Sequence, residues 1–419
     1  MNRLLSVGNK IVAYVDSKKY IGDVIVAVML AFVPIFQHYM GIVDCGSTTI
    51  LVLLLPYLGI RLLSTLSSFR FSNLNFVLVL IVFFIYKMID HGTYFTEVAQ
   101  VVLMTFFMVC ACQSCIDTDA LKRAAICIAV MASACLIIQY FCYYILGFHL
   151  QLVPTSALLP ESSSWIPGAQ TGTIDVTGKV SRIYRPSAFF LEPSHFFLYA
   201  CPSLFITLFS PEGGKYNRIF AILISIGLIL STSGMGIAVA VGAWGLYFAL
   251  RDDEEGAFHL RNIFRRRNLI FIGCFLVVVV LTFAFVPFVR ESIVRIFNNP
   301  EGSTALSGRT KLALSALKKM SFGQWIVGIA DTTTHLSFNM PGFMATVYKY
   351  GIIGVLLSYE IYVKGLFKLN MPYFWLTVIL LIVSFFSAHT HGTFFMLFYV
   401  LLLKEGHNVS KVPWIRGAK

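Results

Sequence analysis

Long apolar runs, separated by short polar stretches, form the main pattern of this chain. A helix needs about 20 residues to cross a bilayer, a length that the runs reach once their flanks are included. Strands with open edges leave backbone groups unsatisfied in lipid, so helices are expected. The pattern predicts an all-α, polytopic integral membrane protein with about 12 transmembrane helices in a single transmembrane domain, residues 1–419. The runs occupy, approximately, residues 22–40, 47–66, 74–89, 95–115, 121–147, 187–209, 218–232, 234–250, 269–289, 343–362, 372–388 and 391–403.

The apolar region 218–250 could form one helix or two. One helix of this length would measure about 50 Å, against a hydrocarbon core of about 30 Å. Small residues at 231–236 interrupt the region, so we predict two short spans that meet at a turn. Two spans also place the arginine run at 265–267 on the same side of the membrane as the N-terminus.

Composition and charge agree with a membrane protein. Hydrophobic residues make up 58% of the chain and charged residues 12%, whereas soluble domains carry roughly 25% charged residues. The net charge of +12 would suit a nucleic acid, but most Lys and Arg residues fall in the loops on the N-terminal side of the membrane. The positive-inside rule then predicts cytoplasmic termini and two long outer loops, 148–186 and 290–342, with membrane lipids and no nucleic acid as partners.

Charged residues mark the end of the first outer loop. Arg182 and Arg185 precede the point where the chain re-enters the membrane, and Glu192 and His195 follow it. Ionisable side chains near lipid are costly and are therefore functional candidates. An Arg–Glu pair that only fixes the loop is the alternative. The earlier part of this loop is rich in Ser, Thr, Gly and Pro and contains Trp165, which suits either a carbohydrate surface or a plain solvated loop.

The second outer loop contains a predicted amphipathic helix near residues 309–320. Its lysines either contact lipid head groups or only hold the helix at the membrane interface. Arg309 stands at the predicted helix start, where free backbone N–H groups favour an anion, so Arg309 and Lys311 are candidate phosphate ligands. The apolar positions that recur at helical spacing are Leu312, Ala316, Leu317 and Met320.

Other polar motifs carry weaker signals. Cys112-Gln-Ser-Cys115 has redox or metal spacing, but it ends an apolar run and has no second ligand pair, so it is interpreted as packing residues. Asp119 is interpreted as a helix N-cap. His389 and His391 are too few to indicate a metal site, and no metal site is predicted.

Four motifs together resemble the Wzy-type O-antigen and capsular polysaccharide polymerases of the O-antigen ligase–polymerase superfamily. The resemblance covers residues 180–400; the first 150 residues match only as a stack of spans. It implies a GT-C-like glycosyltransferase fold in the bacterial cytoplasmic (inner) membrane, with the reaction on the outer, periplasmic face. The motifs are Arg185-x6-Glu192-Pro-Ser, Leu230-Ser-Thr-Ser-Gly234, Gly308-Arg309 and Tyr350-Gly-Ile-Ile-Gly354.

The implied reaction belongs to lipopolysaccharide or capsule biosynthesis. A growing glycan leaves undecaprenyl pyrophosphate and joins the non-reducing end of a lipid-linked repeat unit. The partners would be undecaprenyl-pyrophosphate-linked oligosaccharides and, as a family expectation, a chain-length regulator. The resemblance implies no metal and no cofactor.

The resemblance also implies residue roles. Arg182, Arg185, Arg309 and Lys311 would bind the pyrophosphate, with Arg309 also placed among the catalytic residues. Either Glu192 or His335 would be the base that deprotonates the acceptor hydroxyl. Candidate sugar contacts are Trp165, His195 and Asn339.

Two alternatives remain open at the level of sequence. One is an O-antigen ligase-type glycan transferase, although Met340 occupies the position where ligases carry a histidine. The other is a non-enzymatic transporter or flippase for the lipid-linked oligosaccharide.

Overall fold

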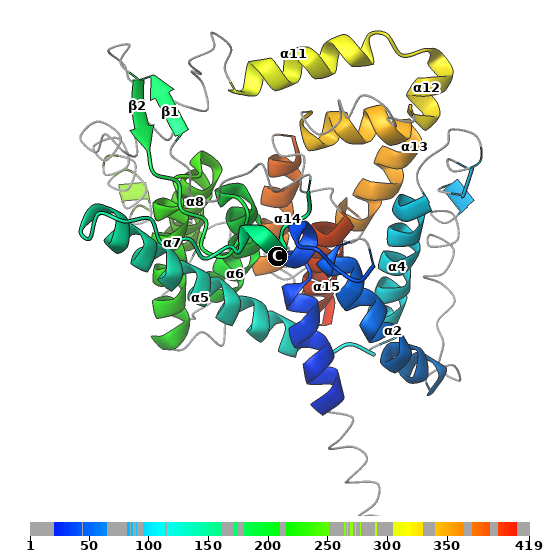
Figure 1. Ribbon diagram of the computed structural model, residues 1–419, viewed down its shortest axis with the longest axis horizontal. Helices are drawn as coiled ribbons and strands as arrows, with labels where there is room; N and C mark the ends of the chain where they lie inside the picture. Colours follow the sequence, from blue (N-terminus) through cyan, green and yellow to red (C-terminus); the bar gives the residue numbers. More distant parts are fainter. Residues whose placement is uncertain are drawn as a thin grey trace, which may run out of the picture.

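The computed structural model is a helical bundle with one small β-hairpin (Figure 1). It describes isolated positions between 82 and 89 and between 264 and 290, together with these ranges: 21–43, 45–64, 95–113, 115–160, 171–174, 180–209, 215–250, 305–329, 340–363, 371–385 and 393–408. After a first helix, Ile21–Phe32, and a 3-10 turn, Phe36–His38, the labelled helices are α2 (Gly46–Ser64), α4 (Phe95–Cys112), α5 (Thr118–Tyr144), α6 (Pro193–Phe209), α7 (Lys215–Leu230), α8 (Gly234–Leu250), α11 (Ala305–Leu317), α12 (Phe322–Val327), α13 (Gly342–Val363), α14 (Met371–Ser384) and α15 (Thr393–Asn408).

The helical fold class is therefore confirmed, and most predicted runs coincide with a helix. Two helices, Gly46–Leu63 and Thr118–Tyr144, are long and apolar enough to cross a membrane by length and composition. Eight shorter apolar helices accompany them within the described residues. This content is compatible with a membrane protein. Most of the predicted run 269–289 lies outside the described residues.

Helix α6 lies at the centre of the bundle. All its side chains except that of Ser194 are buried. A helix that is apolar on every side must be surrounded, and α5, α7, α8, α14 and α15 all pack against this one. Two buried tyrosines tie it to its neighbours, because Tyr199 donates to the carbonyl of Ala31 at 2.8 Å and Tyr399 donates to the carbonyl of Leu198 at 2.9 Å. The chain segment that precedes α6 therefore leads directly into the core of the bundle.

The region 218–250 forms two helices, as predicted. Residues 231–233 make the turn between α7 and α8, and Thr232 adopts φ 56° there. Hydroxyl groups stabilise this conformation. Ser231 Oγ donates to the Leu228 carbonyl at 2.8 Å, and Ser233 Oγ accepts the N–H of Gly236 at 3.3 Å as a cap of α8. The small polar residues that interrupt the apolar run thus act as turn and cap.

Helix α13 is broken at Gly351, which adopts φ 63° and ψ −167°. Figure 1 shows that the helix changes direction along its length. At this break the backbone of α13 contacts the backbone at the end of α12. A Cβ at Gly351 would lie 2.3 Å from the Ile326 carbonyl oxygen, and one at Gly328 would lie 2.3 Å from the Lys349 carbonyl oxygen. Ile329 N–H donates to the Tyr348 carbonyl at 2.7 Å beside it.

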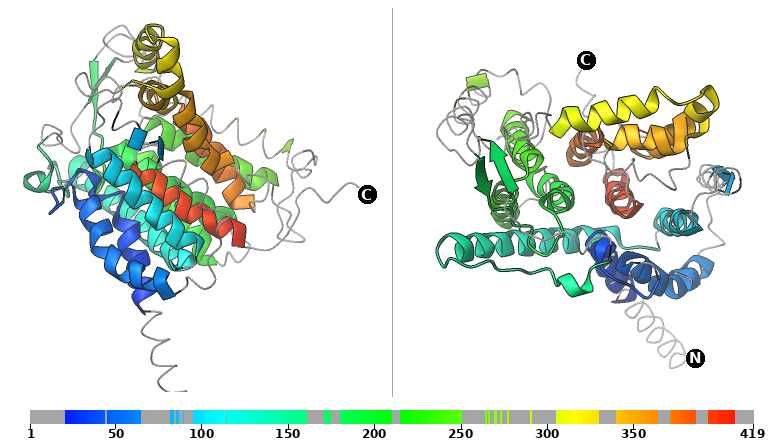
Figure 2. Two further views of the ribbon diagram at one scale, coloured as in Figure 1. Left: turned by 90° about the vertical axis from the view of Figure 1, so that its right-hand side faces the viewer. Right: turned by 45° about the horizontal axis from the view of Figure 1, so that its top comes forward.

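Helices α11, α12 and the first half of α13 share a second, smaller core. Its buried side chains are Ala313, Leu317, Met320, Met340, Val347 and Tyr348. The amphipathic face of α11 therefore packs in part on protein, with Lys311, Lys318 and Lys319 exposed. We call these three segments the cap; Figure 2 shows α11 and α12 along one edge of the bundle.

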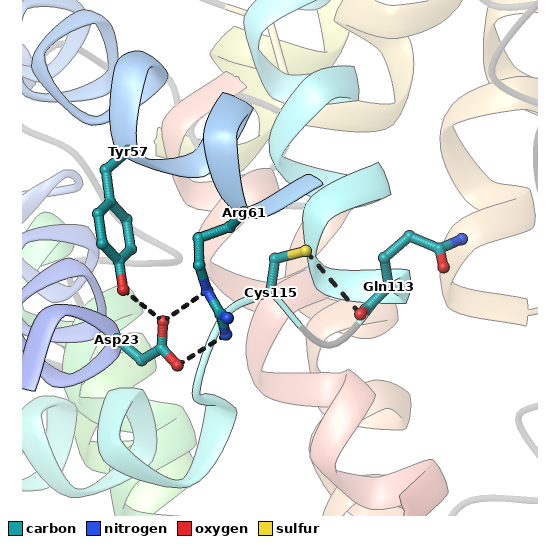
Figure 3. Close-up of polar contacts among 5 residues, drawn as sticks. All are labelled: Asp23, Tyr57, Arg61, Gln113 and Cys115. Carbon is teal, nitrogen blue, oxygen red and sulfur yellow. Dashed lines mark hydrogen bonds and ion pairs between the residues drawn. The ribbon is translucent and has the colours of Figure 1, made fainter. Parts of the chain in front are cut away.

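An ion pair joins the start of the first helix, Ile21–Phe32, to the end of α2 (Figure 3). Arg61 binds Asp23 in a bidentate manner, with Nε–Oδ1 at 3.1 Å and Nη2–Oδ2 at 2.8 Å, and Tyr57 donates to the same carboxylate at 2.8 Å. A Cβ at Gly22 would meet the hydroxyl end of the Tyr57 side chain, so a larger residue there would displace the Tyr57 hydroxyl from Asp23. Cys115 lies nearby and is buried, in agreement with its interpretation as a packing residue.

Three boundaries differ from those predicted. Helix α6 begins at Pro193 and not near 187, because the preceding residues fold as a loop and proline favours the first helical position. Helix α11 begins at Ala305, since Ala305 and Leu306 are good helix formers. Asp117 is the N-cap of α5, accepting the Ala120 N–H at 2.9 Å, whereas Asp119 pairs with Lys122 and Arg123.

The first outer loop also contains two strands that the prediction omitted. β1 (Thr171–Ile174) and β2 (Val180–Ile183) pair in antiparallel register, with Gly172 opposite Arg182. Their β-branched Thr, Ile and Val residues favour an extended backbone. The hairpin leads directly into the segment before α6.

Replacing Gly351 with alanine should destabilise the protein, because the backbone conformation there costs a non-glycine residue about 1–3 kcal/mol and the new Cβ would meet the Ile326 carbonyl. Gly351→Ala should therefore lower the midpoint of thermal unfolding, measured on the purified protein in detergent. Gly323→Ala on α12 is the matched control, because a Cβ there has nothing within 4 Å. Equal midpoints for the two variants would contradict the proposed backbone contact.

Candidate active site

The segment 184–192 forms a buried loop in front of α6. Tyr184, Ser187, Ala188, Phe190 and Leu191 are buried in it. Ala188 adopts φ 53°, a left-handed conformation that is uncommon for alanine and that the surrounding contacts must hold.

Side chains from other helices hold this loop. The Ala188 N–H donates to Gln139 Oε1 at 3.0 Å, while Gln139 Nε2 donates to the Leu150 carbonyl at 3.0 Å. Tyr39 donates to the carbonyl of Phe189 at 3.2 Å. Gln139 lies on α5 and is only 3% exposed. Its two hydrogen bonds connect both ends of the first outer loop to this one helix. A lone glutamine in an apolar run is a signal that could have identified it from the sequence.

Glu192 lies at the N-terminal end of α6. Its backbone carbonyl accepts the N–H groups of His195 and Phe196 at 3.1 and 3.2 Å, and its carboxylate accepts the Ser194 hydroxyl at 2.6 Å. A carboxylate at a helix N-terminus interacts favourably with the helix dipole. Glu192 and Arg185 are both half-buried, so the structure places a carboxylate and a guanidinium at the two ends of one buried loop.

His195 is buried and contacts a second histidine. Its imidazole stacks on that of His38, with ring centroids 4.7 Å apart and planes 18° apart. Phe395, at the start of α15, lies 6.2 Å from it on centroids. The side chain of His195 is 2% exposed, so in this structure it is part of the packed interior below Glu192. His38 was not a candidate from the sequence, because only folding brings the Phe36–His38 turn against α6.

Tyr184 is the first residue of the buried loop, and it contacts aromatic side chains at the end of α5 and just beyond it. Its ring stacks on Tyr143 of α5, with centroids 4.2 Å apart, and lies against His149 at 5.2 Å. Burial raises the pKa of the Tyr184 hydroxyl to about 12, so this hydroxyl stays protonated at neutral pH and can donate a hydrogen bond.

The other candidate cations lie on the hairpin and the cap. Arg182 is on β2, two residues before the buried loop begins. Arg309 lies within α11, and Lys311 is exposed on the same helix. Figures 1 and 2 show the hairpin and α11 at the same end of the molecule, with the start of α11 on the hairpin side.

The predicted helix-start site at Arg309 is wrong. Because α11 begins at Ala305, the free N–H groups of the first turn belong to residues before Arg309. Trp165, His335 and Asn339 lie outside the described residues.

No group of three or more His, Cys, Asp or Glu side chains that could hold a metal ion occurs within the described ranges. The chain matches no protein-family model, and a search of curated proteins found no significant match. Function is therefore inferred from the residues of this chain.

Replacing Gln139 with leucine should loosen the loop before α6. The change removes the partner of a buried N–H and of a carbonyl, each of which costs about 1–3 kcal/mol when left unsatisfied. Gln139→Leu should speed amide hydrogen exchange across 184–192, measured by mass spectrometry, and should lower thermal stability. Gln151→Leu is the control, because Gln151 is exposed and donates only to Val153 nearby. Unchanged exchange in Gln139→Leu would show that the loop is held by other contacts.

Proposed function

We propose that the chain is a Wzy-type polysaccharide polymerase, a membrane glycosyltransferase that joins lipid-linked glycans. The observation that carries the proposal is the buried loop that holds Arg185 and Glu192 at the head of the central helix. Fixed, partly desolvated charges of both signs are what transfer from a pyrophosphate requires, since charge in a site of low polarity interacts strongly.

The proposal includes a chain of about 12 spans with a GT-C-like fold, an outer-face site and cytoplasmic termini. Contacts between distant segments support this topology. His38 and His195 belong to segments predicted on the outer side, and they stack. Asp23 and Arg61 belong to segments predicted on the inner side, and they form an ion pair.

The proposed reaction breaks one bond and forms one. The bond between the glycan's anomeric carbon and the pyrophosphate oxygen breaks, and a bond forms between that carbon and a hydroxyl of the acceptor repeat unit. The hydroxyl proton passes to the base, and undecaprenyl pyrophosphate leaves as the anion. No metal or other cofactor is required in this scheme.

The residue roles follow from the charge that develops on the leaving group and from the proton that must be removed. Arg185, together with Arg182 and Arg309 from the hairpin and the cap, would neutralise the leaving pyrophosphate, because guanidinium groups match phosphate oxygens. Glu192 is the favoured base among the described residues, since its carboxylate is half-buried and already accepts a hydrogen bond from the hydroxyl of Ser194. His335 remains the alternative base.

Two other functions predict different products. A glycan ligase acts after polymerisation, so its loss would leave long lipid-linked polymer. A flippase acts before it, so its loss would leave the repeat unit on the cytoplasmic face. Arg185 lies in the loop that precedes α6, at the predicted outer side of the membrane, where a polymerase needs its cations.

Arg185→Ala should shift the surface glycan from long chains to single repeat units, because a group that neutralises the leaving pyrophosphate is lost. We expect polymerisation of a purified lipid-linked repeat unit by the reconstituted protein to slow about a hundredfold. The readout is a glycan ladder on a gel. Arg185→Lys should retain part of the activity because it keeps the charge, and Arg309→Ala should resemble Arg185→Ala.

The matched control is Arg218→Ala, which removes an exposed arginine near the start of α7, at the opposite end of the α6–α7 pair. Equal amounts of each variant in the membrane and equal thermal midpoints exclude misfolding. Ladders of normal length in both Arg185→Ala and Arg309→Ala would contradict the proposed sites.

A further inference from the structure

Four tyrosines and one histidine gather where α5 ends and the first outer loop begins. Tyr140 and Tyr144 stack with centroids 5.3 Å apart, and Tyr144 meets Tyr143 edge-on at 4.8 Å. Tyr143 in turn stacks on Tyr184, and His149 lies 4.8 Å from Tyr143. We call these five residues the tyrosine cluster.

The tyrosine cluster runs from the surface to the candidate active site. Tyr144 is 59% exposed and His149 is exposed, whereas Tyr143 is half-buried and Tyr184 is 1% exposed. Tyr184 directly precedes Arg185 in the chain. Ring contacts therefore form a continuous path that ends beside a residue proposed to bind pyrophosphate.

The exposed members border the face of α5 that is suited to lipid. Met131, Ile138, Phe141 and Ile145 recur at helical spacing, and each is exposed, which makes one apolar stripe along the helix. Tyr144 borders this stripe, because the exposed residues Ile137 and Phe141 precede it at helical spacing. It also stacks on Tyr140, which contacts Tyr184 of the outer loop. The ring of Tyr144 therefore lies between the apolar stripe and the residues that meet the outer loop.

We propose that the tyrosine cluster is a carbohydrate-binding subsite that holds the glycan chain leading to Arg185. A sugar ring presents an apolar face of C–H groups and a rim of hydroxyls, so an aromatic ring with a polar edge suits it. Tyrosine and histidine supply both the face and the hydrogen-bonding edge. This proposal rests on the proposed function, which identifies the bound glycan as a growing polymer of repeat units.

A belt of tyrosines at the membrane–water interface is the competing explanation. Mutual stacking favours the subsite, because rings that anchor a helix in head groups have no need to contact one another or a buried ring of the outer loop. Stacked rings also lose little conformational freedom when a ligand binds, so they bind with less entropic cost.

The test is direct binding to the purified full-length protein in nanodiscs. The probe is a set of fluorescently labelled oligosaccharides, obtained by partial hydrolysis of the surface polysaccharide of the cells that encode this chain. Tyr144→Ala should weaken binding about tenfold, which corresponds to roughly 1.4 kcal/mol. Tyr144→Trp should bind nearly as well as the unchanged protein, because it keeps a ring for stacking. Position 144 is exposed, so both variants should retain the fold, and the thermal midpoint checks this.

Phe141→Ala is the matched control, since Phe141 is an aromatic residue of similar exposure, 49%, on the apolar stripe. It should leave oligosaccharide binding unchanged. Equal weakening by Phe141→Ala and Tyr144→Ala would assign the cluster to the lipid interface and overturn the subsite, as would absence of saturable binding to the unchanged protein.

The two proposals fail in different ways. If oligosaccharides bind through Tyr144 but the reconstituted, unchanged protein makes no ladder from the purified lipid-linked repeat unit, the subsite stands and the polymerase function falls. If Arg185→Ala abolishes long chains while Tyr144→Ala binds oligosaccharide like the unchanged protein, the function stands and the subsite falls. When both proposals are correct, Tyr144→Ala should also shorten the glycan ladder without abolishing it.

Discussion

The burial of α6 on every side is the constraint on which the arrangement of this protein depends. A helix with apolar residues around its whole circumference is stable only when other helices enclose it. The chain that enters such a helix must also run through the interior, where backbone groups without partners are costly. The loop 184–192 is therefore buried together with α6, and the half-buried charges at its two ends, Arg185 and Glu192, take up fixed positions.

Polar side chains from other parts of the chain satisfy these backbone groups. Gln139 serves the Ala188 N–H and the Leu150 carbonyl, and Tyr39 serves the Phe189 carbonyl. These contacts come from two different parts of the chain and converge on one loop. The same residues that satisfy the buried backbone thus orient the candidate catalytic groups, which links the stability of the bundle to the geometry of the proposed site.

The cap is organised separately from the main core. Close contact between the backbones at Gly328 and Gly351 attaches α12 to α13, and the smaller core beneath α11 holds the helix that carries Arg309. The hairpin carries Arg182, and the tyrosine cluster borders the buried loop from α5. A ligand that bridges these elements would contact residues from several segments that are far apart in the sequence.

The sequence by itself determined the helical class, most helix positions and the turn at 231–233, because apolar runs and small polar residues act over a few neighbours. It also indicated Arg185 and Glu192, since charges at the end of an apolar run stand out. The tertiary structure alone decided the stacking of His38 on His195, the anchoring by Gln139 and the break at Gly351. These depend on which segments pack together, and contacts between segments distant in the chain follow from packing as a whole and not from local pattern. The starts of α6 and α11 also escaped prediction, because a helix end is fixed by the loop that it joins.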